Sequence, residues 1–487
     1  MASSSRNRYL PVKNGLKSFW LKQPHELSDH RSTSTIPEQS DIIIIGAGYA
    51  GVATAYHLLK EGTGAAAGLN ITILEARGAS SGATGRNGGH LRPDLYGHIP
   101  KYIDRAGVRA GAEVAEFEIE NMWAIKKAIE DEKIDCDFTL VRCVDVYCNT
   151  KDATNAKASY DKLVALELDY MKDMFFTADP KEAEAYSGVK GALVAVSFTA
   201  GTMFPYKFIL GLLKILLATG KVNLQTHTPV LSVERDEKRG YAVSTERGTV
   251  YAKQVVHASN GYVAGLLPEY ERNIIPCKGI CTHIEMPEQN RGTAPLFTNS
   301  YSLANDDNTS SYLIPRLDGS IIVGGSRQKF RPFKEQWYHN VDDSILIDAS
   351  KDHYEEYMQR TYRGWEKTDA KVSSIWTGVM GYSFDSNPHI GSVPSKPGQF
   401  ILAGFNGHGM PVIWLGAKGL AKMILADQRG EKLPFSETGI PRLFQTSQLR
   451  IDRAQANKEE DGDILGTGQI FLPKLPIHET HTWKSRL

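Results

Sequence analysis

The sequence predicts an α/β fold that contains a Rossmann-like dinucleotide-binding domain. Four consecutive isoleucines, Ile42–Ile45, indicate a buried parallel strand. Gly46, Gly48 and Gly51 follow in the pattern GxGxxG and lead into an alanine-rich segment that is typical of a helix. A second apolar strand, NITILEA, carries Glu75 at its end. Every part of the dinucleotide-binding fingerprint stands in order, so a glycine turn without a ligand is the weaker interpretation.

Each residue of this motif has a separate physical role. Gly46 permits a tight turn, Gly48 lets the backbone approach a pyrophosphate, and Gly51 lets helix and strand pack closely. The helix N-terminus offers unpaired N–H groups and the positive end of its dipole to an anion. Glu75 can accept hydrogen bonds from both ribose hydroxyls, and its charge argues against NADP, whose 2′-phosphate it would repel.

The stretch SGATGRNGGHLRP, from Ser81 to Pro93, decides between NAD and FAD. A plain NAD domain continues from its second strand into another helix, whereas this chain enters a glycine-rich excursion. Backbone amides there can run beneath a pyrophosphate and then beside a planar ring. FAD has such a ring buried in the protein, so we expect FAD.

Composition and charge exclude several classes of protein. The 487 residues suggest roughly two to three domains. Lys plus Arg equals Asp plus Glu at 56 each, which disfavours a nucleic-acid binder. The five cysteines form no CxxC and lie near no His pair at metal spacing, so we expect no metal site and reduced thiols inside the cell. No run approaches the roughly 18 apolar residues of a transmembrane helix.

The last three residues, Ser485-Arg486-Leu487, are a variant of the Ser-Lys-Leu peroxisomal address. They predict a peroxisomal location and an import receptor as a partner. The alternatives are an incidental polar tail and a cytoplasmic location.

Three motifs together resemble the D-amino-acid-oxidase-like FAD oxidoreductases: Gly46–Gly51, Glu75-Ala76-Arg77 and GATGRNGG from Gly82. Within them the chain looks most similar to the branch with γ-glutamylputrescine oxidase and sarcosine-oxidase-type amine oxidases. The resemblance covers about residues 40 to 430 and implies an FAD-binding domain interleaved with a mixed-sheet α+β substrate domain. We expect an N-terminal extension over 1–40, FAD-binding segments over 41–95, 201–275 and 376–430, substrate-domain segments over 96–200 and 276–375, and a tail over 431–487.

The resemblance also implies which residues contact FAD. In the family the Gly-Arg-Asn part of the loop lies beside pyrophosphate and flavin, although a surface turn is the alternative for Arg86 and Asn87. The helix expected near Pro411 would point its N-terminus at the flavin. The implied cofactor residues are Gly46, Ala47, Gly48, Tyr49, Ala50, Gly51, Glu75, Ala76, Arg77, Thr84, Gly85, Arg86, Asn87, Gly88, Gly89, Val230, Ala258, Asn260, Gly261, Gly378, Gly381, Asn406, Gly407, His408, Gly409 and Met410.

Some relatives in this family attach FAD through a cysteine in the strand that matches TGVMGYSFDSNP. This chain has Tyr382 in that strand and no cysteine beyond Cys281. We therefore expect FAD to be held non-covalently.

The implied activity is oxidation of a small-molecule amine or amino acid, with O₂ as electron acceptor and H₂O₂ as product. The chain has no second GxGxxG motif that could bring in a nicotinamide cofactor. The catalytic candidates each have a plainer alternative. Lys278 is expected near flavin N5 or as a solvated strand lysine, and His90 against the ring or substrate. Tyr301, Tyr312 and Arg316 are expected as an aromatic and cationic substrate wall, or as sheet packing with a surface arginine.

Three other functions stay open from the sequence. The first is a flavin dehydrogenase of a 2-hydroxy acid or similar molecule with an acceptor other than O₂. The second is an FAD-holding protein without turnover, and the third is a tailoring oxidase in a biosynthetic pathway.

Overall fold

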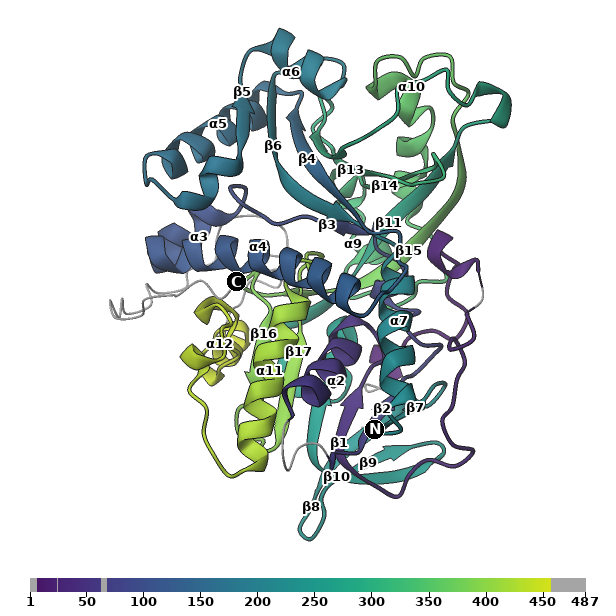
Figure 1. The fold of residues 1–487 in the computed structure, drawn as a ribbon, viewed down its shortest axis with the longest axis vertical. Coiled ribbons are helices and arrows are strands. Elements are labelled where there is room, and N and C mark those ends of the chain that lie inside the picture. Colours follow the sequence, from purple (N-terminus) through teal and green to yellow (C-terminus); the bar gives the residue numbers. More distant parts are fainter. Residues whose placement is uncertain (1–6, 24, 63–67, 457–487) are drawn as a thin grey trace.

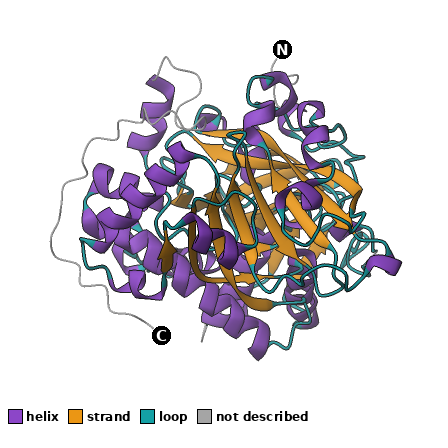
Figure 2. Cartoon of the chain, turned by 90° about the horizontal axis from the view of Figure 1, so that it is seen from above, coloured by secondary structure: helices purple, strands orange, loops and turns teal. Residues whose placement is uncertain are grey.

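Two β-sheets with helices on their faces organise the chain (Figures 1 and 2). The computed structural model describes residues 7–23, 25–62 and 68–456. The helices are α2 (Tyr49–Glu61), α3 (Ile99–Ala106), α4 (Val108–Asp131), α5 (Thr150–Val164), α6 (Pro180–Ser187), α7 (Pro205–Ala218), α8 (Arg327–Phe330), α9 (Lys334–Trp337), α10 (Tyr357–Thr361), α11 (Ile413–Gln428) and α12 (Gln448–Ala456).

The first sheet, sheet A, contains the predicted dinucleotide-binding strands. It comprises β1 (Gln39–Ile45), β2 (Ile71–Leu74), β7 (Val222–Gln225), β8 (Val230–Asp236), β9 (Gly240–Thr245), β10 (Gly248–His257), β16 (His389–Ser392) and β17 (Gln399–Ala403). The order is β16-β17-β10-β1-β2-β7, and the β8–β9 hairpin joins β10. β1 pairs in parallel with both β2 and β10. Ile42, Ile43 and Ile44 are fully buried, as expected for a central parallel strand that is covered on both faces.

Helix α2 follows β1 directly and packs against α7 and α11 beside sheet A (Figure 1). The contact between α2 and β1 is close because Gly51 has no side chain: a Cβ there would lie 1.9 Å from the carbonyl oxygen of Gly46. α2 ends at Glu61. α11 begins at Ile413, two residues after the expected start near Pro411.

The second sheet, sheet B, covers the carboxyl-terminal side of sheet A (Figure 1). Its strands are β3 (His90–Leu91), β4 (Thr139–Tyr147), β5 (Phe175–Thr177), β6 (Val194–Thr202), β11 (Ile274–Glu285), β12 (Ser300–Ala304), β13 (Ser310–Pro315), β14 (Ile321–Gly325) and β15 (Lys371–Ser383). They run β15-β11-β14-β13-β12-β4-β6-β3, with β5 beside β6. β4 and β12 pair in parallel and the other neighbours are antiparallel, which makes sheet B mixed.

The chain passes repeatedly between the two sheets. Sheet A takes strands from residues 39–74, 222–257 and 389–403, and sheet B takes strands from 90–202, 274–325 and 371–383. This interleaving is the arrangement that the sequence predicts. β3 lies before the expected change of domain at residue 95, and β15 crosses the one expected at 375, so the exact boundaries stay predictions.

The N-terminal segment packs on the fold before β1 begins. Trp20 is fully buried, and the backbone N–H of Ser32 donates to the carbonyl of Leu224 at the free edge of β7. The expected peroxisomal address, residues 485–487, lies outside the described residues. No helix within 7–23, 25–62 and 68–456 is long and apolar enough to cross a bilayer. In the same ranges, no group of three or more His, Cys, Asp or Glu side chains is placed to hold a metal ion.

Candidate active site

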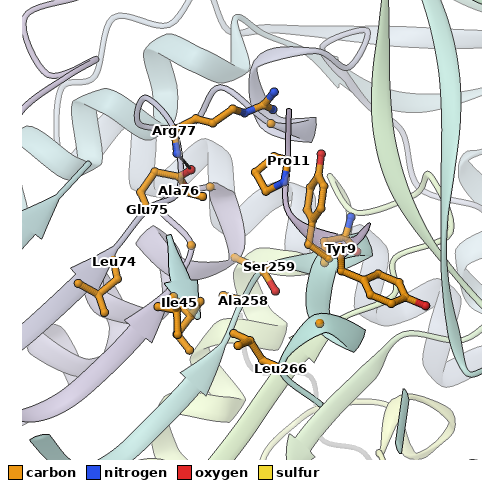
Figure 3. Close-up of a pocket in the computed structure, with 18 of the residues that line it drawn as sticks. Tyr9, Pro11, Ile45, Leu74, Glu75, Ala76, Arg77, Ala258, Ser259 and Leu266 are labelled. Carbon is orange, nitrogen blue, oxygen red and sulfur yellow. Dashed lines mark hydrogen bonds between the residues drawn. The ribbon is translucent and has the colours of Figure 1, made fainter. Parts of the chain in front are cut away.

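A cavity of about 710 Å³, the dinucleotide cavity, lies at the carboxyl ends of the parallel strands of sheet A (Figure 3). Its wall includes Ile45 at the end of β1, Leu74 at the end of β2, and Ala258 just after β10. Parallel strands place their carboxyl ends at one edge, which is where α/β sheets bind ligands. The sequence-predicted residues that line it are Gly46, Gly48, Tyr49, Ala50, Glu75, Ala76, Arg77, Thr84, Val230, Ala258 and Asn260.

Glu75 is held at the edge of this cavity by two backbone donors. One carboxylate oxygen accepts from the N–H of Ala47 at 2.9 Å and the other from the N–H of Arg77 at 2.8 Å, the bond drawn in Figure 3. Each oxygen keeps a further lone pair. Glu75 is therefore oriented to accept hydroxyl donors from a ligand in the cavity.

Several polar groups of the residues in the cavity wall have no partner among the described residues. The hydroxyls of Tyr49, Ser259 and Tyr262 are buried and make no hydrogen bond to any described residue. These oxygens have almost no accessible surface and so lie behind the cavity wall. The glycine turn, Glu75 and the cavity volume fit the ribose and pyrophosphate of a dinucleotide such as FAD.

A second cavity of about 390 Å³, the chamber, lies between sheets A and B. It shares Tyr49, Thr84, Asn260 and other wall residues with the dinucleotide cavity, so the two adjoin. β11, β15 and the turn after β17 supply much of its wall. The sequence-predicted residues that line the chamber are Tyr49, Thr84, Arg86, Asn87, Gly88, His90, Asn260, Lys278, Tyr312, Gly378, Asn406, Gly407, His408, Gly409 and Met410.

Six of the predicted cofactor residues line neither cavity. They are Ala47, Gly51, Gly85, Gly89, Gly261 and Gly381. Two of them support the cavity wall from behind. The backbone N–H of Ala47 donates to the Glu75 carboxylate. Gly261 packs so closely on β15 that a Cβ there would lie 2.8 Å from the carbonyl oxygen of Met380. The structure thus places these positions in the packing of the site rather than on its surface.

The side chain of Asn87 makes three hydrogen bonds within the glycine-rich loop. The side-chain amide of Asn87 donates to the carbonyls of Ala83 and Thr84 at 3.2 and 3.1 Å, and its oxygen accepts from the N–H of Gly89 at 2.7 Å. Asn87 also lines the chamber. Its hydrogen bonds hold the loop in one conformation at the chamber wall.

Arg77 and Arg86 share one buried carboxylate, that of Asp343. Arg77 contacts it through two nitrogens at 2.9 and 3.0 Å, and Nε of Arg86 lies 3.2 Å from Oδ2. The side chain of Asp343 has no exposed surface. Arg86 also donates to the carbonyls of Ser81 and Thr377. Its guanidinium thus joins the loop to sheet B, and no motif in the sequence points to Asp343 as the partner.

Tyr312 stands in the chamber wall between two glycines. A Cβ on Gly88 would lie 2.5 Å from the Tyr312 ring, and one on Gly324 would lie 2.2 Å from its hydroxyl. That hydroxyl is 2.9 Å from Sγ of Cys281. Close approach of the Tyr312 ring, and not only of a cofactor, therefore accounts for Gly88 in the loop.

Burial lowers the pKa of two side chains that line the chamber, His90 and Lys278. Burial, followed by the neighbouring Arg92, lowers the pKa of His90 to about 3, so this imidazole is neutral at neutral pH. Its Nε2 lies 2.8 Å from the hydroxyl of Ser300. Burial also lowers the pKa of Lys278, whose Nζ donates to the carbonyl of Ile345 at 2.8 Å. His408 lies 2.8 Å from the carboxylate of Glu118, which fixes its ring at the wall.

The structure places Arg316 and Tyr301, which were expected in the substrate wall, outside both cavities. Arg316 lies outside both cavities, pairs with Asp137 at 2.5 Å and extends over the ring of Trp20. The reason is that β13 ends at Pro315, so the strand alternation that aligns Tyr312 no longer applies at residue 316. Tyr301 is buried among other aromatic rings and lines neither cavity.

Other residues that the sequence analysis missed complete the chamber wall. Arg92 lines it and pairs with Asp145 at 2.5 Å. Arg327 lines it from the start of α8, with its guanidinium 5.1 Å from the centre of the Tyr382 ring. Phe330 and Trp337 supply further aromatic surface. The one local signal for Arg327 is a cation placed directly after the strand ending Gly324-Gly325.

The fold and the two adjoining cavities define a dinucleotide-binding oxidoreductase with a second sheet closing the reaction chamber. The FAD dependent oxidoreductase family (DAO) matches residues 41–423, and the chain belongs to this family. The cofactor class, the fold class and the family resemblance predicted from the motifs are thereby confirmed.

Individual relatives are distant. The probable oxidoreductase OrdL of Haemophilus influenzae is 23% identical over 402 residues, covering 80% of this chain and 84% of that protein. Gamma-glutamylputrescine oxidoreductase of Escherichia coli is 22% identical over 400 residues, with the same coverage. The crystal structure of glycine oxidase from Geobacillus kaustophilus superimposes with a TM-score of 0.65 at 16% identity, covering 85% of this chain and 99% of that one.

Proposed function

We propose that this protein is an FAD-dependent oxidase of an amine or amino acid, and that its substrate carries an anionic group. The chamber supports the proposal. Its charged lining residues include Arg86, Arg92, Lys278 and Arg327, and no Asp or Glu of the described chain lines it. Asp343 and Asp145 behind the wall balance Arg86 and Arg92, so the preference for an anion rests on Lys278 and Arg327. Such a wall favours an anion over a polycation. Relatives named gamma-glutamylputrescine oxidoreductase and glycine oxidase support an amino-group substrate.

FAD held in the dinucleotide cavity would supply two-electron oxidation: overall the amine would lose a hydride and a proton to give an imine, which water hydrolyses, and O₂ would gain two electrons and two protons as H₂O₂. The chain's own residues prepare the substrate. The aromatic side chains of Tyr312, Phe330 and Tyr382 line the chamber. Such a wall solvates an ammonium ion poorly and so favours the neutral amine that can be oxidised. Arg327 would hold the anionic end of the substrate and orient it.

The test is an anaerobic panel of amino acids, N-methyl amino acids, monoamines and polyamines on the purified yellow protein. We expect the flavin absorbance to be bleached by an amine that carries an anion, and to return in air with release of peroxide. Flavin that stays reduced in air would favour a dehydrogenase with another acceptor. Flavin that no compound bleaches would favour a binding protein without turnover.

A second arm of the same experiment examines the charge preference. Arg327→Met is expected to raise KM for anionic amines by about tenfold or more, because a charge-assisted hydrogen bond is lost. The neutral amines in the panel should be affected much less. Arg331→Met, an exposed arginine four residues away, is the matched control and should leave both unchanged. An equal effect of Arg327→Met on charged and neutral amines would contradict the proposed role.

Non-covalent binding of FAD gives a separate prediction. Both Cys277 and Cys281 line the chamber, but burial raises the pKa of Cys281 to about 12, so its thiol is not a nucleophile at neutral pH. We expect acid precipitation to leave all of the flavin in the supernatant. Cys281→Ala should release the same amount. Flavin that remains with the precipitated wild-type protein, but not with that variant, would show a covalent bond.

A peroxisomal location remains a prediction from residues 485–487. If it is correct, the peroxide would be formed beside catalase.

A further inference from the structure

Part of the wall of the dinucleotide cavity comes from residues that precede the family-matched region. Tyr9, Leu10 and Pro11 line the cavity, whereas the match to the family begins at residue 41. Figure 3 shows Tyr9 and Pro11 across the cavity from Leu74 and Glu75. We call residues 9–20, which run from this wall to the glycine-rich loop, the N-terminal strap.

The first part of the strap is anchored through the hydroxyl and the ring of Tyr9. Tyr9 is only 5% exposed, and its hydroxyl donates to Oε1 of Glu271 at 3.3 Å. The guanidinium of Arg8 lies 5.0 Å from the ring centre and pairs with the same glutamate. The Tyr9 ring is therefore held at the cavity wall and is not a loose surface group.

The remainder of the strap is fastened to the parts of the site already described. Nη1 of Arg77 donates to the carbonyl of Val12 at 3.2 Å, and the N–H of Leu16 donates to the backbone carbonyl of Asp343 at 2.9 Å. Further along, the buried hydroxyl of Ser18 donates to the carbonyl of Gly85 at 2.5 Å. The indole N–H of Trp20 donates to the carbonyl of Asn87 at 2.6 Å.

We propose that Tyr9, Leu10 and Pro11 are part of the FAD-binding site and that the strap slows the release of FAD. The cavity they close has the glycine turn and Glu75 on its opposite side, so a dinucleotide there lies between the family's own motif and the strap. A group bound against this wall would contact Tyr9, Leu10 and Pro11, and its release would be eased by movement of the strap. Because the strap is fastened at Val12, Leu16, Ser18 and Trp20, that movement breaks several buried hydrogen bonds.

The experiment measures FAD release from the holoenzyme through the rise in flavin fluorescence after dilution. Tyr9→Ala is expected to speed release by about tenfold, since it removes the ring from the wall. Pro11→Gly is expected to speed it by a few-fold. Tyr9→Phe keeps the ring and loses only the bond to Glu271, so its release should stay near the wild-type rate. Asn14→Ala, at an exposed strap position that lines neither cavity, is the control.

A second readout separates cofactor binding from stability alone. Added FAD raises Tm by an amount that grows with the logarithm of its concentration over Kd, so this rise should be smaller for Tyr9→Ala than for the wild type. A variant that lowers Tm equally with and without added FAD, and releases FAD at the wild-type rate, would overturn the proposal. If Tyr9→Ala does not fold, unchanged release from Pro11→Gly overturns it instead. Neither readout requires a substrate, so failure of the oxidase assignment would leave this test intact.

Discussion

Asp343→Asn is expected to lower the free energy of unfolding by about 3–5 kcal/mol, because it leaves two buried guanidiniums without their shared counter-charge. Arg77 and Arg86 both contact this carboxylate, and the carboxylate has no exposed surface. The loss can be measured by denaturant unfolding of the holoenzyme in the presence of excess FAD. It should be one of the largest effects of any conservative substitution in the chain.

Two variants test the cause of this loss. Asp352→Asn changes an exposed carboxylate nearby in the sequence and should stay within about 0.5 kcal/mol of the wild type. Adding Arg86→Met to Asp343→Asn removes one of the two unpaired cations and should recover part of the stability. Losses that simply add in the double variant would argue against charge pairing as the reason.

The stability of the protein is expected to fall steeply as the pH drops from about 6.5 to about 4. Burial lowers the pKa of several histidines: to about 3 in His57 and His90, to about 4 in His257, His283 and His353, and well below the usual value in His389. In this window the unfolded chain binds protons that the folded chain does not. Each such histidine therefore removes up to about 1.4 kcal/mol per pH unit.

The pH slope of the unfolding free energy tests this directly. His257 lies in β10 with Nε2 2.8 Å from the side-chain oxygen of Gln399. His257→Gln removes one titrating group, so the slope between pH 4 and pH 6.5 should decrease by about one proton. His227→Gln, at a side chain that is 49% exposed, controls for the effect of the substitution itself. An unchanged slope in His257→Gln would show that other groups govern the acid unfolding.

The parts of the site that could be predicted from sequence are those encoded over short distances along the chain. β1, the glycine turn, α2 and Glu75 fall within residues 39–75, and each has a local pattern that is tied to its structure. The chamber residues Lys278 and Tyr312 were found because the family resemblance supplied the layout of sheet B. The same resemblance placed Arg316 at the substrate wall, but β13 ends at Pro315 and the Arg316 side chain pairs with Asp137 instead.

The contacts that could not be predicted join segments far apart in the chain. Asp343 is 266 residues from Arg77 and belongs to no motif, so only the tertiary fold reveals the pair. The N-terminal extension was expected, but its place at the cavity wall was not. Its one local signal is the presence of Tyr9, Phe19 and Trp20 in an otherwise polar segment, since aromatic side chains of this size usually pack against something.

The interleaved order of the strands has a consequence for synthesis of the protein. Sheet A gains β17 only at residues 399–403, and the dinucleotide cavity is also lined by Phe405 and Ile413. The cavity is therefore incomplete until more than four-fifths of the chain has left the ribosome. The nascent β10 meanwhile lacks its neighbour β17, and the strap segment around Leu16 lacks Asp343. Cofactor loading must therefore wait until residue 413 has emerged, and the growing chain would meanwhile present open strand edges to which chaperones can bind.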